Sequence, residues 1–322
     1  MTHILALCGG VGGAKLVLGL TQCLAPEDLT IVVNTGDDFE HLGLSISPDI
    51  DTVLYTLAGL SNPEQGWGRA GETWNFMQAV AQLGGETWFR LGDNDLALHV
   101  ERTRRLAAGE TLSEITASFA QSLGVLHNIV PMTDDPVRTQ VHCNIGTLSF
   151  QHYFVREQCA PKARGISFDG SDKARPSHGF TKALEHPGLG AIIYCPSNPY
   201  LSIDPILSLA ATRKALARTG VPRIAVSPIV GGKAVKGPTA KLMQELGFPI
   251  DQVSIAAHYS GLIDVLVVDQ TDTASRDLVR STGIDCIASQ TIMHDRESKI
   301  RLARSMLEIA AQFREARSRI RA

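Results

Sequence analysis

Acidic residues recur in this sequence at the points where apolar segments end. Asp37 and Asp38 follow one such run, and Asp93 and Asp95 follow another, with His99 one helical turn beyond Asp95. Pairs of carboxylates at this spacing can hold a hard cation, orient a hydroxyl group or act as a general base. Helix capping or turn formation also explains each acid taken alone. Two acidic clusters that meet in one cleft would favour the chemical interpretation.

A further carboxylate, Asp51, lies in the first turn of a helix that should begin at Pro48, with Ser47 as its N-cap. Asp49 in the same turn can stabilise the helix dipole by about 0.3–1 kcal/mol. Asp51 instead projects on the face that carries Tyr55. Asp51 is therefore the stronger candidate for chemistry.

A glycine-rich segment joins the first apolar run, residues 4–7, to an amphipathic stretch that predicts a helix. A tight glycine turn lets backbone amides approach a ligand closely, and the helix N-terminus adds partial positive charge that favours phosphate. Lys15 adds a full positive charge. We therefore expect a phosphate site here, although the same glycines could serve only to permit a sharp turn. The glycines are Gly9, Gly10, Gly12 and Gly13.

Two familiar nucleotide motifs do not fit this segment. Read from Gly10, a dinucleotide fingerprint requires glycine at the position of Lys15, which argues against NAD. A Walker A loop requires Ser or Thr after its lysine, but Leu16 stands there, so no hydroxyl is available for magnesium. Any metal must therefore be bound by carboxylates elsewhere in the chain.

Further polar groups follow other apolar runs. Arg90 offers a planar, charged donor fork to a ligand. Ser197 and Asn198 can read a base or a ribose edge by hydrogen bonds. The segment GGKAVKGPT offers a second cradle for an anion, with an exposed turn as the alternative. Its candidate residues are Gly231, Gly232, Lys233, Lys236 and Gly237.

The apolar runs alternate with helical patterns, which predicts an α/β fold with a doubly wound, mainly parallel sheet. The strand-like runs are ILAL (4–7), LTIVVNT (29–35), TWFRL (87–91), GAIIYC (190–195), RIAVS (223–227) and IDVLVVD (263–269). Alternation of polar and apolar residues around an Asn-Ile-Gly turn predicts an inserted β-hairpin element. We therefore divide the chain into a core, residues 1–137 and 180–322, and a small inserted β/helical element, residues 138–179.

Composition excludes several classes of protein. The formal charge of −3 and the lack of a basic patch interleaved with aromatics argue against nucleic-acid binding. No apolar stretch approaches the roughly 20 residues that span a bilayer, so we expect a cytoplasmic protein without membrane contact. The six cysteines form no C-x-x-C pair, which argues against a zinc or redox motif. The basic final helix, 295–322, is expected to present a solvated face rather than a membrane or anion contact.

Taken in order, these segments resemble the 2-phospho-L-lactate transferase family of coenzyme F420 biosynthesis. The resemblance covers nearly the whole chain and implies a Rossmann-like fold, usually in a homodimer. It also implies a phospho-group transferase that moves a phospholactyl or related group from a GDP-linked donor to the ribityl hydroxyl of 7,8-didemethyl-8-hydroxy-5-deazariboflavin (Fo). GMP is released and Mg²⁺ is required. The motifs are GGVGGAKL, VVNTGDD, SPDIDTVLYTLAG, GWGRAGETWNFM, WFRLGDND, MTDDPVRT, PSNPYLSIDPIL and SPIVGGKAVKGP.

The resemblance also implies roles for individual residues. Asp51 and Arg90 would contact Fo. The donor would be held by Gly10, Gly12, Gly13, Lys15, Asn34, Ser197, Asn198 and Gly232. Magnesium ligands would come from Asp37, Asp38, Asp51 and Asp93, and the catalytic base from Asp38, Asp51 and Asp93.

Two alternatives stay open. Many relatives have Arg where this chain has Asn94, so phospholactate, phosphoenolpyruvate and phosphoglycerate all remain candidate acids. Regulatory proteins of the gluconeogenesis-factor type share the glycine loop and the fold but bind nucleotide sugars. After the second strand, those proteins have a segment similar to DDGGSSG. This chain has GDDFEHLGLSISPDIDT there, which favours the transferase.

Overall fold

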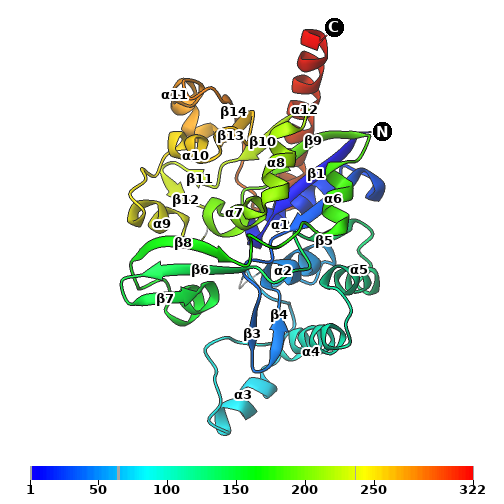
Figure 1. Cartoon of the computed structure of the whole chain (residues 1–322), viewed down its shortest axis with the longest axis vertical. Coiled ribbons are helices and arrows are strands. Elements are labelled where there is room, and N and C mark those ends of the chain that lie inside the picture. The colour runs from blue at the N-terminus through cyan, green and yellow to red at the C-terminus, as the bar shows by residue number, and fades with distance from the viewer. Residues whose placement is uncertain (1, 64–65, 236, 322) are drawn as a thin grey trace.

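A parallel sheet of seven strands forms the centre of the protein (Figure 1). The computed structural model describes residues 2–63, 66–235 and 237–321. The strands lie in the order β14-β13-β10-β9-β1-β2-β5. This order reverses between β1 and β9, the switch point at which open α/β sheets bind ligands. The strands are β1 (His3–Cys8), β2 (Leu29–Val33), β5 (Asn128–Pro131), β9 (Leu189–Tyr194), β10 (Arg223–Val226), β13 (Val265–Asp269) and β14 (Asp285–Ser289).

Helices cover both faces of this sheet, which confirms the doubly wound α/β prediction. Successive residues of a strand point to opposite faces. Leu5 and Leu7 of β1 accordingly join one apolar cluster, and Ile4 and Ala6 join the other. The first cluster includes side chains from α6 (His178–Leu184), α7 (Asp204–Ser208), α8 (Ala210–Arg218), α10 (Gln252–His258) and α11 (Arg276–Arg280). The second includes side chains from α1 (Gly10–Thr21), α2 (Pro48–Leu57), α5 (Leu112–Ser122) and α12 (Arg296–Arg321).

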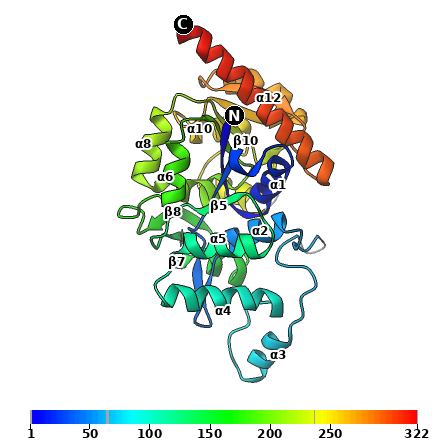
Figure 2. The same cartoon turned by 90° about the vertical axis from the view of Figure 1, so that its right-hand side faces the viewer.

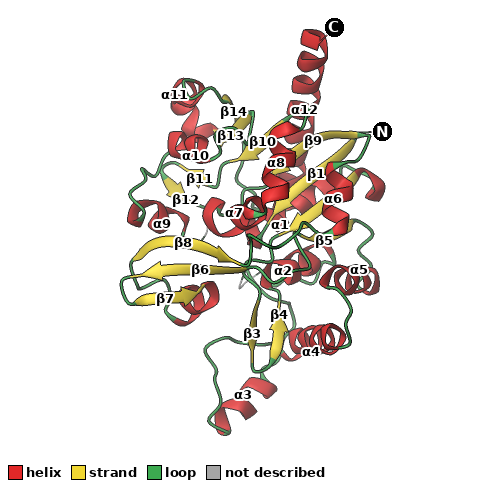
Figure 3. Ribbon diagram, in the orientation of Figure 1, coloured by secondary structure: helices red, strands yellow, loops and turns green. Residues whose placement is uncertain are grey.

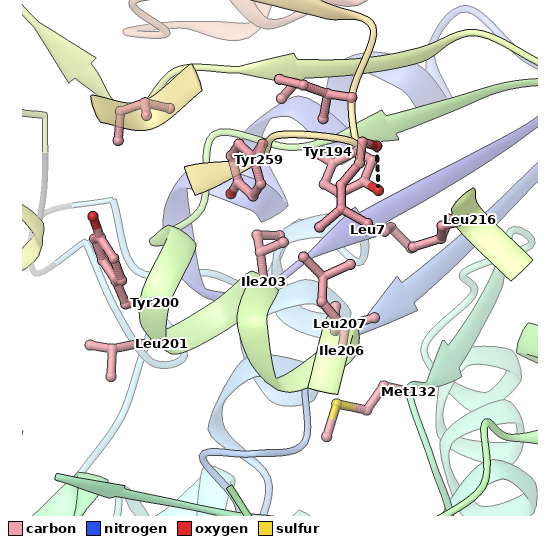
Figure 4. Packing of buried hydrophobic residues seen from close by; sticks show 14 of the residues in the cluster. Leu7, Met132, Tyr194, Tyr200, Leu201, Ile203, Ile206, Leu207, Leu216 and Tyr259 are labelled. Carbon is pink, nitrogen blue, oxygen red and sulfur yellow. Dashed lines mark hydrogen bonds between the residues drawn. The ribbon is translucent and has the colours of Figure 1, made fainter. Parts of the chain in front are cut away.

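The first cluster anchors the chain that follows β9. Ile203 and Leu207 pack over Leu7 and Tyr194 of the central strands, and all four side chains are buried (Figure 4). Burial of apolar area at about 25 cal/mol per Å² makes this packing a strong positional constraint. It fixes the turn η3 (Pro199–Ile203) and the residues just before it, which lie at the switch point.

The inserted element forms a separate three-stranded antiparallel sheet, in the order β7-β6-β8 (Figure 3). The predicted hairpin around the Asn-Ile-Gly turn is present, because Cys143 pairs with Gly146. Val141 and Tyr153 of this element join the same apolar cluster as Leu7. The division of the chain into two units stays a prediction. The elements are β6 (Arg138–Cys143), β7 (Gly146–Ser149), a π-helical turn η2 (His152–Arg156) and β8 (Ala163–Asp169).

Smaller elements surround the switch point. Figures 1 and 2 show α3 projecting at the end of the molecule opposite to the C-terminus of α12. Two short hairpins pair β3 with β4 and β11 with β12. The bounds are β3 (Phe39–His41), β4 (Leu44–Ile46), α3 (Asn75–Gln82), α4 (Asp93–Ala107), β11 (Ile229–Val230), β12 (Lys233–Ala234) and α9 (Thr239–Glu245). Two 3-10 turns, η1 (Pro26–Asp28) and η4 (Gln270–Ser275), complete the described elements.

The predicted strand over residues 87–91 is wrong. These residues form an irregular segment, and Trp88 and Phe89 pack against the hairpin β3–β4 instead. The ring of Phe89 lies 4.8 Å from that of Phe39, and the ring of Trp88 lies 5.0 Å from that of His41. Aromatic residues suit a strand and an aromatic cluster equally, so composition alone did not distinguish them. The edge strands β5 and β14 were not predicted.

The final helix, α12, packs against α1 across the second face of the sheet. Leu302 and Met306 are buried in this contact, while Arg301 and Arg304 are exposed, as expected for a solvated basic face. A Cβ atom on Gly19 would lie 2.1 Å from the carbonyl oxygen of Lys299, so the two helices touch where α1 has no side chain. Within the described residues, no helix combines the length and apolarity needed to cross a bilayer.

Candidate active site

A cleft of about 590 Å³ lies at the switch point between β1 and β9. The start of α1 and the loop after β9 line it, together with residues of α2, α4, the segment 88–90 and the inserted element. Gly12 and Asp51 share this cavity with Asp37 and Asp95, so the glycine segment and both acidic clusters meet in one cleft. The predicted site residues that line it are Gly10, Gly12, Lys15, Asp37, Asp51, Arg90, Ser197 and Asn198.

The glycines of α1 allow the helix to meet the loop after β9. The Ser197 hydroxyl accepts a hydrogen bond from the Gly9 backbone N–H (3.1 Å) and donates one to the Gly9 carbonyl (2.8 Å). A Cβ atom on Gly12 would lie 2.4 Å from the carbonyl oxygen of Pro196, and one on Gly13 would lie 2.5 Å from Oγ of Ser197. Gly13 does not line the cleft. These glycines therefore serve close packing as well as ligand access.

The N-terminus of α1 lies between a cation and a carboxylate. Lys15 donates a hydrogen bond to the carbonyl of Met293 (3.2 Å), which holds its ammonium group at the cleft wall. Asp49 accepts a hydrogen bond from the Gly10 backbone. Burial raises the pKa of Asp49 to about 6, while hydrogen bonds from Asn34 and Gly10 oppose this rise. Asp49 thus contacts the start of α1, in addition to the helix-dipole role within α2 that the sequence suggested.

Asp51 of α2 forms a buried ion pair with Arg102 of α4. The guanidinium group donates to both carboxylate oxygens, through Nη1 to Oδ2 (3.2 Å) and through Nη2 to Oδ1. Nη1 also donates to the carbonyl of Ser45 (3.3 Å). Burial raises the pKa of Asp51, and the charge of Arg102 opposes that rise. A bidentate pair of this kind fixes the carboxylate in one orientation at the cleft.

A second carboxylate, Asp95, lies beside this pair. Nε2 of His99 lies 3.3 Å from Oδ2 of Asp95, and Tyr55 donates a 2.5 Å hydrogen bond to Oδ1 of Asp95. Nη1 of Arg102 lies 3.3 Å from Nδ1 of His99 on the other side of the ring. Burial alone would raise the pKa of Asp95, but the interactions with His99 and Tyr55 lower it below its ordinary value. One ligand atom from each of Asp51, Asp95 and His99 lies within 4.8 Å of the others.

Asp37 and Asp38 have different surroundings although they are adjacent. Asp37 lines the cleft, and its Oδ1 has no hydrogen-bond partner in the described part of the chain. Burial and the nearby Asp49 charge raise the pKa of Asp37 well above its ordinary value. Asp38 does not line the cleft, and its Oδ2 accepts a hydrogen bond from Ser47 (2.8 Å). Burial raises the pKa of Asp38 to about 7, against the opposing charge of Arg138.

Ser47 occupies the N-cap position of α2, as predicted, but its hydroxyl does not cap the helix. The side chain makes no hydrogen bond to the first turn and donates to Asp38 instead. Pro48 begins the helix, and its missing N–H reduces the need for a side-chain cap. The serine therefore connects α2 to the acidic loop after β2.

Asp93 lies outside the cleft and caps α3. Its carboxylate accepts hydrogen bonds from the backbone N–H groups of Asn75 and Phe76, both at 3.1 Å, and from the Thr73 hydroxyl. These bonds lower the pKa of Asp93 to about 2. Glu72 makes the reciprocal contact, accepting hydrogen bonds from the first turn of α4. The structure therefore shows Asp93 in a helix-capping position, away from the carboxylates at the cleft.

Asn34 is fully buried behind the cleft. Its amide donates to Oδ2 of Asp49 (2.9 Å) and to the carbonyl of Leu201, and its Oδ1 accepts a hydrogen bond from the Gly36 backbone. Asn198 does line the cleft, and its Oδ1 caps η3 through the backbone N–H groups of Tyr200 and Leu201. Asn34 therefore supports the site from beneath, whereas Asn198 borders the cavity.

Arg90 lies at the rim of the cleft over an aromatic ring. Its guanidinium carbon is 4.0 Å from the centroid of the Trp74 ring, a cation–π contact that restricts where the side chain can lie. Asn94 is exposed and does not line the cleft. Its amide donates to the carbonyl of Gly71 (3.2 Å). The structure therefore gives Asn94 no contact through which it would grip a donor in the cleft.

The segment GGKAVKGPT does not form the expected cradle in its first half. Gly231 and Gly232 have positive φ values and make the turn of the β11–β12 hairpin, and neither lines the cleft. Lys233 is exposed on β12, and Lys236 lies outside the described residues. Gly237 does line the cleft. The positive φ required at the hairpin turn explains the glycine pair.

Sequence reasoning missed Arg102 and the aromatic wall of the cleft. Arg102 falls three residues after His99, which places both on one face of α4, and this spacing was the available signal. The aromatic wall comes from residues far apart in the sequence, so no local pattern could reveal it. Its rings belong to Trp67, Trp88, Phe89, Phe150 and Phe154.

The comparisons with known proteins concern the family and the fold of the chain. Residues 4–310 match the family model described as 2-phospho-L-lactate transferase CofD. The phosphoenolpyruvate transferase of Streptomyces coelicolor is 39% identical over 320 residues, covering 98% of this chain and 100% of that protein. The 2-phospho-L-lactate transferase of Methanocaldococcus jannaschii is 35% identical over 314 residues, covering 96% and 99%.

A solved structure supports the fold alone. A crystallised UPF0052-family protein from Bacillus halodurans superposes with a TM-score of 0.60 at 14% identity, covering 95% of this chain and 98% of its own. The family match and the full-length transferase relatives place the function class more firmly than this structural likeness does. The chain belongs to the 2-phospho-L-lactate transferase CofD family.

Proposed function

We propose that this protein transfers a phospho-acid group from a GDP-linked donor to the ribityl hydroxyl of Fo and releases GMP. The observation that supports this most directly is the single cleft at which the N-terminus of α1 and Lys15 face the carboxylates of Asp37 and Asp51. A helix N-terminus with a lysine suits a diphosphate, and carboxylates suit a hydroxyl nucleophile. One cavity thus offers surfaces for both substrates.

Phosphoenolpyruvate is the acid we propose to test first. The relatives from Streptomyces coelicolor and Streptomyces griseus, at 39% and 38% identity, are named phosphoenolpyruvate transferases. The relative from Methanosarcina acetivorans, at 36%, is named a 2-phospho-L-lactate transferase. Phospholactate and phosphoglycerate therefore remain the comparison donors.

The residues present fit a divalent cation such as Mg²⁺. Asp51 and Asp95 supply the oxygen ligands that this cation prefers. Nε2 of His99 is buried and makes no hydrogen bond within the described part of the chain. We propose that these three side chains hold it, in place of the ligand set Asp37, Asp38, Asp51 and Asp93 inferred from the sequence. A bound cation would offset charge on the transferring phosphoryl oxygens.

Asp37 is our candidate for the general base. It lines the cleft, has an unpartnered oxygen and has a raised pKa, which brings its basicity closer to neutral pH. Asp51 is less suited because we assign its carboxylate to the cation, and Arg102 already pairs with both of its oxygens. In the step, the ribityl oxygen bonds to the phosphorus that carries the acid, the bond from that phosphorus to GMP breaks, and the hydroxyl proton passes to Asp37.

The test combines the purified protein with Mg²⁺, Fo and each GDP-linked acid in turn, and measures GMP release. We expect release with at least one donor, and a loss of at least a hundredfold in kcat for Asp37→Asn with the fold retained. No release with any donor, combined with tight binding of a nucleotide sugar, would support the gluconeogenesis-factor alternative. Unchanged turnover in Asp37→Asn would remove Asp37 from the mechanism.

The homodimer stays a prediction of the family resemblance, and the cytoplasmic location stays a prediction of the sequence composition. Sedimentation of the purified protein measures the first, and fractionation of the source cells measures the second.

A further inference from the structure

We infer that Gln151 reads the imide edge of the deazaflavin ring, so that the inserted element selects the acceptor substrate. This inference rests on the function proposed above and assigns a specificity role that the sequence did not suggest. Gln151 immediately precedes the turn η2 and lines the cleft. Its side chain is the polar group that the inserted element contributes to this cavity.

The side-chain amide of Gln151 is available to a ligand. The residue is only 5% exposed, yet no hydrogen bond from the described part of the chain reaches its side chain. Its amide atoms are not sealed from solvent, so they open onto the cleft and not onto a protein partner. An unpaired amide on a cleft wall is therefore a group that a ligand can satisfy. It offers one acceptor oxygen and two donor hydrogens.

Two aromatic residues that line the cleft, Phe150 and Phe154, flank Gln151 along the chain. Phe150 is buried next to it, and the ring of Phe154 stacks on Phe150 with centroids 5.3 Å apart and 14° between the planes. Phe154 is 40% exposed although it lines the cleft. Trp88 also lines the cleft, and the ring of His152 supports it at 4.6 Å. Flat apolar rings beside one polar group suit a planar heterocycle with a polar edge.

The neighbours of Gln151 favour the deazaflavin ring over the guanine ring as its ligand. The GDP moiety is expected at the start of α1 and at Ser197, where the helix N-terminus and Lys15 lie. Gln151 instead directly precedes His152, whose ring contacts Trp88, and Trp88 lies two residues before Arg90, the residue expected to contact Fo. The pyrimidinedione edge of a deazaflavin carries an N3–H donor between two carbonyl acceptors. A carboxamide pairs with one N–H and one adjacent carbonyl of such an edge through two hydrogen bonds.

The π-helical turn η2 gives this wall a defined shape. The turn η2 follows Gln151 directly, and such turns are rare and are frequent at functional sites. Tyr153 within it is fully buried and receives a hydrogen bond from Lys241 (3.2 Å). The turn is therefore anchored from behind, which holds Gln151 and Phe154 toward the cavity.

The experiment measures the binding of Fo and of N3-methyl-Fo by ring fluorescence, in the full-length wild-type protein and in Gln151→Met. Methionine keeps the length of the side chain and removes its hydrogen bonds. We expect Gln151→Met to weaken Fo binding about tenfold, the change expected for about 1.4 kcal/mol of lost polar interaction. We also expect the wild type to prefer Fo over N3-methyl-Fo, and the variant to lose most of this preference.

Two controls separate this inference from the proposed function. GDP binding should be unchanged in Gln151→Met, and Gln121→Leu, an exchange on the exposed face of α5, should leave Fo binding unchanged. If Fo binds equally to wild type and Gln151→Met, or if the variant keeps the full preference over N3-methyl-Fo, the inference is overturned while the proposed function stands. If the wild type binds GDP but not Fo, both are overturned. The comparison of the two ligands on the wild type needs no variant, so an absence of preference there also overturns the inference.

Discussion

Replacing Arg102 with methionine would leave the Asp51 carboxylate buried without its partner. Arg102 is 1% exposed, and its Nη1 and Nη2 donate to both oxygens of Asp51. Removing one member of a buried ion pair typically costs about 3–5 kcal/mol, because the remaining charge is uncompensated. Against a total stability of about 5–15 kcal/mol, this is a large loss. We expect Arg102→Met to lower the free energy of unfolding by about this amount at pH 8.

The loss should depend on pH in a defined direction. Burial already raises the pKa of Asp51, and the charge of Arg102 limits that rise. An acid with a raised pKa in the folded state binds more protons folded than unfolded, so stability falls as pH increases from its unfolded pKa through its folded pKa. Without the Arg102 charge the pKa of Asp51 rises further, so the pH range over which stability falls extends to higher pH. The variant should therefore be closer to wild type at pH 5 than at pH 8.

The assay is urea unfolding at both pH values, with the double variant Asp51→Asn/Arg102→Met completing a mutant cycle. Removing the charge together with its partner should recover most of the stability, because a neutral amide costs less to bury than a carboxylate. The reasoning is refuted if Arg102→Met lies within about 1 kcal/mol of wild type at pH 8, the range of a surface ion pair. It is also refuted if the loss is the same at both pH values.

Three further predictions concern the cleft and its supports. Gly12→Ala would place a Cβ atom 2.4 Å from the Pro196 carbonyl oxygen, so we expect GDP binding, measured by calorimetry, to weaken at least tenfold. In the control Gly165→Ala the new Cβ meets only His142, at 3.7 Å, so GDP binding should not weaken. Since the pKa of Asp49 is raised to about 6, the folded state loses stability as pH rises from about 4 to 6. Asp49→Asn should remove this part of the decline in the free energy of unfolding. A variant whose free energy of unfolding falls with pH as steeply as that of wild type would contradict the raised pKa of Asp49. Asp93→Asn should speed hydrogen exchange of the Asn75 and Phe76 amides, which bond to its carboxylate, and unchanged exchange there would argue against the capping role.

The central sheet was readable from the sequence because each of its main strands carries a local signal. The runs at β1, β2, β9, β10 and β13 are apolar on both faces, as buried parallel strands must be. The helix that begins at Pro48 was equally clear from its cap position and periodicity. The edge strand β14 buries only Cys286 fully, and β5 ends at Pro131, a residue that sequence reasoning excludes from central strands, so the signal of both is weaker.

The site was readable only in part, because several of its contacts join distant segments. Asp51 and Lys15 could be selected from their local positions. The pairing of Asp51 with Arg102 spans 51 residues and depends on how α2 meets α4. Asp93 and Asp95 illustrate the limit: they are two residues apart, yet Asp93 caps α3 whereas Asp95 faces His99. Which of two neighbouring carboxylates faces a cleft is decided by tertiary packing.

The bond between Gly9 and Ser197 has a consequence for how the protein is made. These residues are 188 positions apart, so the floor of the cleft needs both β1 and β9. During synthesis, the ribosome releases β1 and β2 long before β9 emerges, and β1 must wait with one edge unpaired. An open strand edge of this kind invites association with other chains. We therefore expect the nascent polypeptide to be prone to aggregation before residue 197 leaves the exit tunnel, and only afterwards can the cleft form.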